Sequence, residues 1–228
     1  FAAMERVTFS SAKGEASGEL AVPAGSGRAG AVIVIHEWWG LNAHTRDVTE
    51  RLAAEGFLAI ALDIYHGEVT ADAAAAMKLA NEMNTADALD EIRAALAFLR
   101  AQPRSNGKGA IMGFCLGGAV SLAAACQVDG LAAALPFDGN PRADLVDFSR
   151  PTPPIQAHYA AQDAHVNVER TREIAKGVEQ AGGLFELHVY DAGHAFMRST
   201  DPAVYDAVSA KTAWERSIRF LRGHLAAD

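Results

Sequence analysis

The sequence predicts an α/β protein in which a mostly parallel central sheet is covered by helices on both faces. Short apolar segments alternate with longer helix-like segments along the chain, the pattern of a parallel sheet built from strand–helix–strand units. Ala31–Ile35 is a continuous run rich in β-branched residues, as expected for a strand buried on both faces. A glycine-rich hexapeptide, residues 113–118, follows another apolar run and predicts a tight strand-to-helix turn.

Strands are expected where short apolar runs are bounded by turn residues. Val7–Ser10 and Glu19–Val22 predict a short antiparallel start to the sheet, and Gly109–Met112 leads into the glycine-rich turn. The other strands are expected at Ala31–Ile35, Leu58–Leu62, Leu131–Phe137, Pro154–Tyr159 and Leu184–Tyr190.

Helices are expected over longer segments that carry start and stop signals. The first turns of Thr85–Arg100 are acidic, which suits the positive end of the helix dipole. Asn167 is expected to cap the helix Val168–Ala181, and Gly182 to end it. The remaining helices are expected at Thr45–Glu55, Ala71–Asn81, Ala119–Cys126 and Ala203–Leu225, and Asp63–Thr70 is expected to be a loop.

Length and composition predict one domain, residues 1–228, because 228 residues with 50% hydrophobic side chains can build one sizeable core. Residues 1–3 precede Met4 and are set aside as a candidate vector remnant. The net charge is −8 and the basic residues form no cluster, which argues against nucleic-acid binding. No apolar run approaches the roughly 18 residues of a membrane span, so no membrane partner is expected.

The cysteines and the N-terminus predict a cytoplasmic protein. Cys115 and Cys126 are separated by 11 residues, which in a helix is about 16 Å and too far for a disulfide. Free thiols are typical of a reducing compartment. The first residues also lack the basic segment and long apolar core of a signal peptide.

The hexapeptide Gly113-Phe114-Cys115-Leu116-Gly117-Gly118 has the form Gly-x-nucleophile-x-Gly, with cysteine where hydrolases usually carry serine. Such a turn presents the nucleophile between a strand and a helix, and its crowding leaves room only for glycine at the flanking positions. The pattern therefore predicts Cys115 as a catalytic nucleophile. Cys126 is expected to be a small core residue.

A cysteine nucleophile needs a base and a group that orients the base. Asp163 and His194 follow the strands expected at residues 154–159 and 184–190, and their order after Cys115 matches nucleophile, acid, histidine. Cys115, Asp163 and His194 are therefore the predicted triad. His165 is a weaker candidate for the base, and Asp191 a rival for the orienting acid.

A further carboxylate, Glu37, follows the buried strand that ends at Ile35. In this architecture the loop after that strand passes over the nucleophile and supplies one oxyanion N–H, while Leu116 supplies the other. Glu37 is then expected to reach the thiol and take part in its ionisation, since only the thiolate is an effective nucleophile. The alternative is a loop carboxylate in solvent.

Over nearly its whole length the sequence resembles the dienelactone hydrolase family, within the α/β-hydrolase fold. The matching segments are Glu37-Trp38-Trp39-Gly40-Leu41-Asn42, Asp63-Ile64-Tyr65, Ser105-Asn106-Gly107-Lys108, residues 113–118, Gln162-Asp163, and Ala192-Gly193-His194-Ala195-Phe196-Met197-Arg198.

The resemblance implies hydrolysis of a carboxylated enol-lactone, dienelactone, to maleylacetate through a cysteine acyl-enzyme, as in the degradation of chloroaromatic compounds. It implies that Glu37 holds the resting thiol and accepts its proton when substrate arrives. It also implies that the oxyanion is bound by the N–H groups of Leu116 and Trp38. Arg198 matches a family arginine that binds the substrate carboxylate, and a guanidinium suits that task because it can donate two parallel hydrogen bonds. A surface arginine is the alternative for Arg198.

One departure from the family concerns a second carboxylate-binding arginine after the Asp-x-Tyr segment. Between Tyr65 and Glu91 the only cation here is Lys78. Either Lys78 substitutes as a point charge, or the pocket is adapted to another ester or lactone. Trp38, Trp39, Tyr65 and Phe196 are expected as apolar walls of the pocket, or else as core.

The leading prediction is therefore a hydrolase of small, carboxylated esters or lactones. A broad-specificity ester hydrolase is the first alternative, and a scaffold that binds a ligand or senses oxidants without turnover is the second. We expect no cofactor and no metal, and a monomer or homodimer.

Overall fold

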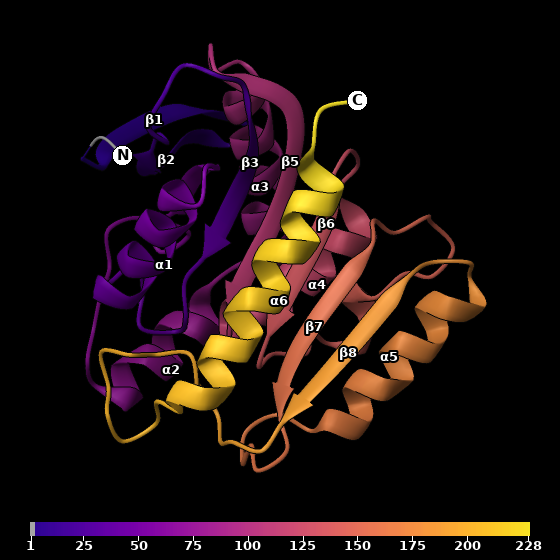
Figure 1. The fold of residues 1–228 in the computed structure, drawn as a ribbon. Helices are drawn as coiled ribbons and strands as arrows, with labels where there is room; N and C mark the ends of the chain where they lie inside the picture. Colours follow the sequence, from indigo (N-terminus) through magenta and orange to yellow (C-terminus); the bar gives the residue numbers. More distant parts are fainter. Residues whose placement is uncertain (1–2) are drawn as a thin grey trace.

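In the computed structural model, which describes residues 3–228, eight strands form one sheet in the order β1-β2-β4-β3-β5-β6-β7-β8 (Figure 1). The interpretation of residues 1–3 as a remnant falls mainly outside the described residues. The strands are β1 Glu5–Ser11, β2 Gly14–Ala21, β3 Ala29–Ile35, β4 Leu58–Leu62, β5 Ser105–Phe114, β6 Ala133–Phe137, β7 Ile155–Ala160 and β8 Phe185–Tyr190.

The sheet is mostly parallel, as predicted. Strand β1 pairs antiparallel with β2, and β2 pairs antiparallel with β4, whereas the pairings from β4 through β8 are parallel. Every residue of β3 is buried. Its alternate side chains enter two different cores, Ile33 and Ile35 on one face and Val32 and Val34 on the other. This explains the continuous apolar run in the sequence.

Helices cover both faces of the sheet, which also agrees with the prediction. One core lies between the sheet and helices α3, α4 and α5, and the other lies between the sheet and helices α1 and α6. Figure 1 shows α6 lying across the near face, with α3 and α4 behind the strands. The helices are α1 Ala43–Ala54, α2 Ala73–Glu82, α3 Thr85–Arg100, α4 Leu116–Gln127, α5 Val168–Gln180 and α6 Ala207–Leu225, with a short 3-10 helix at Ala143–Leu145.

Several element boundaries differ from the sequence expectation, and β2 begins at Gly14 rather than at Glu19. Strand β5 begins at Ser105, four residues before the expected start at Gly109. The side chains of Ser105 and Asn106 accept hydrogen bonds from the backbone two residues later, a pattern typical of turns, so the sequence does not indicate a strand there. Helix α4 begins at Leu116, although two glycines in its first turn lower helix propensity. Helix α6 begins only at Ala207, where the side chain of Asp206 caps it by accepting from Ser209 N–H.

The strand order places one edge of the sheet at a switch point. From β3 the chain moves outward to β4, and then returns to the other side of β3 to form β5. The carboxyl ends of β3 and β5 therefore lie side by side where the connections diverge, and such a crevice is where open α/β sheets bind ligands.

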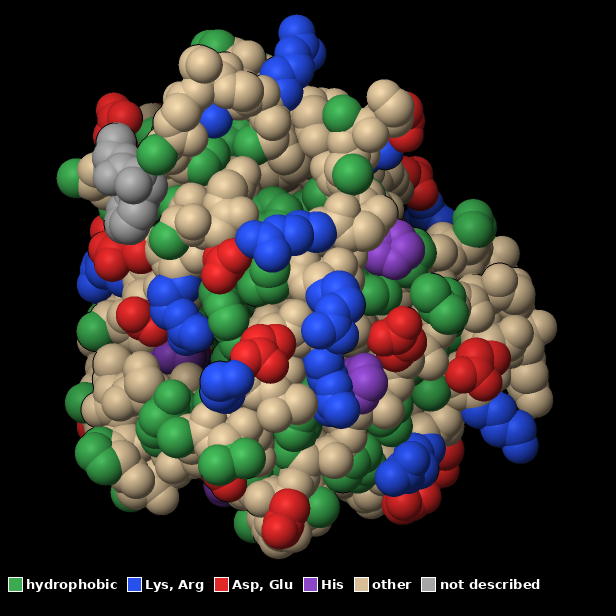
Figure 2. Space-filling view, viewed as in Figure 1, with side chains coloured by type: hydrophobic (Ala, Val, Ile, Leu, Met, Phe, Trp, Pro, Cys, Tyr) green, Lys and Arg blue, Asp and Glu red, His purple; other side chains and the backbone are tan. Residues whose placement is uncertain are grey.

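The outer surface carries charges of both signs. Figure 2 shows Lys and Arg side chains interspersed with Asp and Glu on the face that includes α6. None of the helices in residues 3–228 is both long and apolar enough to cross a membrane.

Candidate active site

Cys115 occupies the turn between β5 and α4, as predicted from the glycine pattern. Its φ is 56°, a left-handed conformation that is uncommon for a residue with a side chain. A methyl group on Gly113 would overlap the Gly117 carbonyl, and one on Gly117 would overlap the Ile35 carbonyl. The glycines thus allow the strained turn that leaves the Cys115 side chain partly exposed.

The structure brings Cys115, His194 and Asp163 together in one hydrogen-bonded chain. His194 Nε2 lies 3.2 Å from Cys115 Sγ, and His194 Nδ1 lies 2.7 Å from Asp163 Oδ2. Three separate loops, after β5, β7 and β8, supply these side chains at the same edge of the sheet. The arrangement matches the geometry of a nucleophile, its base and the group that orients the base.

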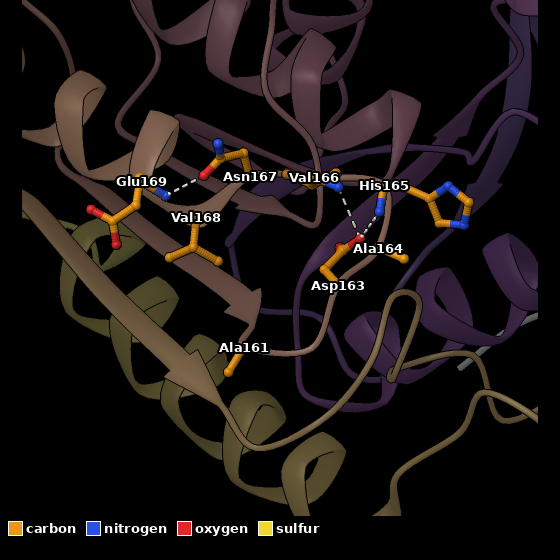
Figure 3. A pocket seen from close by; sticks show the side chains of 8 residues that line it. All are labelled: Ala161, Asp163, Ala164, His165, Val166, Asn167, Val168 and Glu169. Carbon is orange, nitrogen blue, oxygen red and sulfur yellow. Dashed lines mark hydrogen bonds between the residues drawn. The ribbon is translucent and has the colours of Figure 1, made fainter.

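The side chain of Asp163 is fixed by the loop after β7. Its Oδ1 accepts hydrogen bonds from the backbone N–H groups of His165, at 2.7 Å, and Val166, at 2.9 Å (Figure 3). Burial alone would raise the pKa of Asp163, but the hydrogen bonds from His194 and from these amides keep it below its usual value. Asp163 is therefore ionised at neutral pH and faces His194.

His194 is placed to remain protonated beside the sulfur. Burial alone would lower the pKa of His194, but its interactions with Asp163 and Cys115, together with the charge of Asp138, raise it to about 10. A protonated imidazole next to a thiol favours the thiolate. The geometry can therefore produce a thiolate–imidazolium pair.

The rival residues occupy other positions. The His165 ring points away from the Asp163 carboxylate in Figure 3, and its centroid lies 5.0 Å from that of His194. Asp191 accepts a hydrogen bond from Gln162 at the surface. Cys126 is a buried free thiol on α4, as expected for a core residue.

Glu37 and Arg198 form a buried ion pair beside the triad. Arg198 Nη1 donates to Glu37 Oε2 at 2.8 Å, and the two side chains are 3% and 13% exposed. Burial raises the pKa of the Glu37 carboxyl, while the charge and hydrogen bond of Arg198 act in the opposite direction. Neither residue is a surface charge, so both surface alternatives are wrong.

The expected contact between Glu37 and the resting thiol is not present. Among the hydrogen bonds of residues 3–228, Glu37 bonds to Arg198 and Cys115 to His194. A buried carboxylate is stabilised far more by a guanidinium than by a neutral thiol, because an unpaired buried charge is costly. In this arrangement the thiol's proton acceptor is His194, and Glu37 is held away by Arg198.

The two predicted oxyanion donors face a common cavity of about 670 Å³ together with Cys115 and His194. Leu116 is the first residue of α4, so its N–H has no acceptor within the helix. Trp38 lies in the loop directly after β3, and its N–H donates to no other group in the described chain. Both amides are therefore available to an oxygen placed beside the sulfur.

The remaining predicted wall residues divide into two groups. Trp38 and Trp39 line the cavity with Arg198, whose guanidinium lies 5.9 Å from the Trp39 ring centroid. Tyr65 and Phe196 are buried in the two cores rather than in the cavity wall. The Tyr65 ring packs against His36 and the Phe196 ring against Tyr190, which buries their apolar surface.

Lys78 does not contribute to the cavity, contrary to the expectation that it could replace a second arginine. Its side chain is 76% exposed on the outer side of α2, and its Nζ lies 3.8 Å from Glu82 Oε1. The inner side of α2 presents Ala80 and Asn81 instead. Arg198 is thus the one lysine or arginine among the described residues that line the cavity, where the protonated His194 is the other positive group.

Sequence reasoning missed Asp138, which lines the same cavity. This residue follows β6 directly and is only 1% exposed. A carboxylate at the carboxyl end of a buried strand is the signal that could have identified it, as it identified Asp163 and Glu37.

Comparison with known proteins gives a consistent result. The model of the dienelactone hydrolase family matches residues 17–225. The protein usf of Aquifex pyrophilus is 35% identical over 203 residues, covering 85% of this chain and 88% of that protein. The carboxymethylenebutenolidase of Pseudomonas sp. (strain P51) is 29% identical over 225 residues, covering 92% of this chain and 90% of the relative.

A solved structure has the same fold over the full chain. The crystal structure of a dienelactone hydrolase-like promiscuous phosphotriesterase from metagenomic libraries superimposes with a TM-score of 0.85. It is 26% identical and covers 99% of this chain and 100% of its own.

Proposed function

The chain belongs to the dienelactone hydrolase family, and from this premise we propose that it cleaves small carboxylated esters or lactones with Cys115 as nucleophile. The observation that carries the proposal is the hydrogen-bonded chain from Cys115 through His194 to Asp163, at 3.2 and 2.7 Å. Hydrolysis of an ester is the chemistry to which a nucleophile, a base and two free amide donors are suited.

In the proposed acylation step, the Cys115 thiolate attacks the ester carbonyl. The resulting oxyanion accepts hydrogen bonds from the N–H groups of Leu116 and Trp38, two residues that line the cavity. When the carbon–oxygen bond breaks, the leaving oxygen takes the electron pair, and the His194 imidazolium can supply a proton to it. In a lactone this oxygen becomes the enolate end of the same molecule.

In the proposed deacylation step, a water molecule attacks the thioester on Cys115. His194, now neutral, accepts the proton of that water, and Asp163 stabilises the imidazolium that forms. The thiolate leaves, the acid product is released, and the thiolate–imidazolium pair is restored. In an enol-lactone whose leaving oxygen stays an enolate, His194 keeps its proton, and the enolate itself accepts the proton of the attacking water.

Arg198 is proposed to bind the substrate carboxylate, since it is the one lysine or arginine among the described residues that line the cavity. A substrate carboxylate would compete with Glu37 for the guanidinium. Glu37 would then be an unpaired buried carboxylate near the sulfur, with burial raising its pKa, and in a molecule whose Cys115 thiol still holds its proton it could accept that proton in place of His194. The resting ion pair thus links carboxylate binding to the reactivity of Cys115.

A broad-specificity ester hydrolase is the second candidate, and one observation favours it. The cavity wall formed by α2 carries Ala80 and Asn81 and lacks a second cation. A substrate's anionic group is therefore neutralised by one residue only, which weakens selection against neutral esters. The phosphotriesterase-like structural relative is itself described as promiscuous.

A hydrolysis panel separates these candidates. Wild type, Cys115→Ala and the matched control Cys126→Ala are compared on cis- and trans-dienelactone and on neutral aryl acetates. We expect Cys115→Ala to lose turnover on all substrates and Cys126→Ala to keep it, with a higher kcat/KM for the lactones. Aryl acetates that are cleaved equally well or better would favour the second candidate, and turnover surviving in Cys115→Ala would overturn the assignment of the nucleophile.

A further inference from the structure

Asp138 brings a second carboxyl group to the catalytic histidine. Its Oδ2 accepts a hydrogen bond from the backbone N–H of Ala195, the residue after His194, at 3.3 Å. Its own N–H donates to His158 O at 3.3 Å, which ties the residue to the end of β7. The loop that carries His194 is therefore anchored to the end of β6 through a carboxylate.

The carboxyl groups of Asp138 and Asp163 and the imidazole of His194 form one cluster. One carboxylate oxygen of Asp138, one of Asp163 and one ring nitrogen of His194 all lie within 4.8 Å of one another. Asp163 uses both oxygens, one toward His194 and one toward backbone amides. Asp138 Oδ1, by contrast, is buried and has no hydrogen-bond partner among the described residues.

The backbone at Asp138 has an uncommon conformation. Its φ is 52°, and Ala195 at the other end of the hydrogen bond has a φ of 65°. Asparagine tolerates this conformation as aspartate does, and an asparagine oxygen would serve the Ala195 N–H equally well. An aspartate in a strained, buried position beside a reactive histidine indicates a use for its ionisable group.

We propose that Asp138 is a positioning residue for His194, a second carboxyl that stays protonated beside the ionised Asp163 and limits the pH range in which His194 can release its proton. The proposal rests on the proposed role of His194. The two carboxyl groups are close enough that their simultaneous ionisation is unfavourable, so one of them keeps its proton. Asp163 has more donors and remains ionised, and the proton stays on Asp138.

The groups that face Asp138 support this distribution. Burial raises the pKa of Asp138 to about 8, with His194 and the Ala195 N–H acting to lower it and the charges of Asp163 and Glu37 acting to raise it. The Tyr159 hydroxyl, which also faces this region, donates to the Gly139 carbonyl and has a raised pKa through burial, so it stays neutral.

The consequence for His194 depends on pH. Below about pH 8 Asp138 is neutral, and Asp163 alone balances the imidazolium. Above that pH Asp138 ionises, and its charge stabilises the imidazolium further. His194 then releases its proton to a leaving oxygen less readily, so turnover is expected to fall on the alkaline side.

The first test compares the pH dependence of kcat in wild type and Asp138→Asn. Asparagine keeps the shape, the acceptor for Ala195 N–H and the backbone conformation, but cannot ionise. We expect the wild type to lose activity through about pH 8 and the variant to show this loss displaced upward by at least about one pH unit. An unchanged alkaline limb would overturn the proposal. Asp191→Asn, an exposed carboxylate three residues before His194, is the matched control and should retain the wild-type profile.

A second test removes the primary acid. In Asp163→Asn the neighbouring charge that hinders Asp138 is gone, so Asp138 is expected to ionise near neutral pH and partly replace it. The double variant Asp163→Asn/Asp138→Asn should then be at least about tenfold slower than Asp163→Asn. Equal rates for the single and double variants would contradict the proposal.

A third measurement does not depend on the reaction. The ring nitrogens of His194 are followed by NMR in ¹⁵N-histidine-labelled wild type, Asp138→Asn and Asp191→Asn between pH 5 and pH 10. We expect a step near pH 8 in wild type and Asp191→Asn that is absent from Asp138→Asn. A step that persists in Asp138→Asn overturns the role of Asp138 whether or not the chain hydrolyses esters. Turnover that survives Cys115→Ala would instead overturn the proposed function alone.

Discussion

The two sides of the catalytic cavity hold their carboxylates in different ways. On the triad side, Asp163 receives two backbone hydrogen bonds in addition to that of His194, so its position is set by the fold. On the opposite side, Glu37 is paired with one side chain, Arg198, and its second oxygen is buried with no hydrogen-bond partner among residues 3–228. The first arrangement suits a carboxylate that permanently orients His194. The second suits an ion pair in which a substrate carboxylate can replace Glu37 on Arg198.

The largest effect is expected on the fixed side. Asp163→Asn removes the charge that orients His194 and stabilises its protonated form, so kcat should fall about 10²- to 10⁴-fold with little change in KM. Steady-state kinetics with a neutral aryl ester measures this loss. Asp191→Asn should retain wild-type kinetics, and the opposite ranking of these two variants would show that Asp191 is the orienting acid.

A smaller, substrate-dependent effect is expected on the exchangeable side. Arg198→Ala should raise KM for carboxylated lactones about 10- to 100-fold, the loss expected for a charged hydrogen bond, and have little effect on neutral esters. Because this variant leaves Glu37 unpaired, Arg198→Ala/Glu37→Gln is the control that separates lost binding from a buried charge. Equal losses for both substrate classes in the double variant would mean that Arg198 is structural.

The comparison also predicts a pH dependence of stability. The pKa of Asp138 is about 8 in the folded protein against an ordinary value of 3.8, so between these values the unfolded chain is ionised and the folded chain is not. As the pH rises from about 4 to about 8, the free energy of unfolding of the wild type therefore falls relative to that of Asp138→Asn.

Thermal unfolding at a series of pH values measures this difference. Asp138→Asn should gain little at pH 4 and at least about 4 °C in Tm at pH 8, with no further gain above that pH. A Tm difference that does not change between pH 4 and pH 8 would show that Asp138 is already ionised in the folded protein.

The smallest effect is expected for Lys78. Its exposed side chain pairs with Glu82 outside the cavity, and exposed pairs of this kind contribute little. Lys78→Ala should change KM for carboxylated lactones by less than about twofold. A larger increase, measured beside Arg198→Ala, would indicate that Lys78 does act as the second cation.

Sequence reasoning was most successful where local geometry dictates the residue. The elbow at Cys115 needs its glycines because carbonyl groups occupy the space of a side chain. The strands before Asp163 and His194 are short segments that end at turn residues, with β7 fully buried and β8 mostly half-buried. These signals are local, so one sequence is enough to identify them.

Contacts between distant segments could not be predicted in this way. Helix α2 is rich in alanine, so its periodicity does not show which side faces the cavity, and Lys78 lies on the outer side. The pairing of Glu37 with Arg198 joins residues 161 positions apart in the chain. The position of Asp138 at a strand end marks it as a candidate, but its burial next to His194 and Asp163 is a contact between distant segments that no spacing in the sequence indicates.

The central claim is that Cys115 forms the acyl-enzyme, and it can be tested directly by mass spectrometry. The protein is mixed with a slowly hydrolysed aryl ester, quenched in acid and digested, and the peptides carrying Cys115 and Cys126 are compared. We predict one acyl group on Cys115, none on Cys126, and none in Cys115→Ala. An acyl group on another residue, or turnover in Cys115→Ala without any acyl-enzyme, would contradict the account.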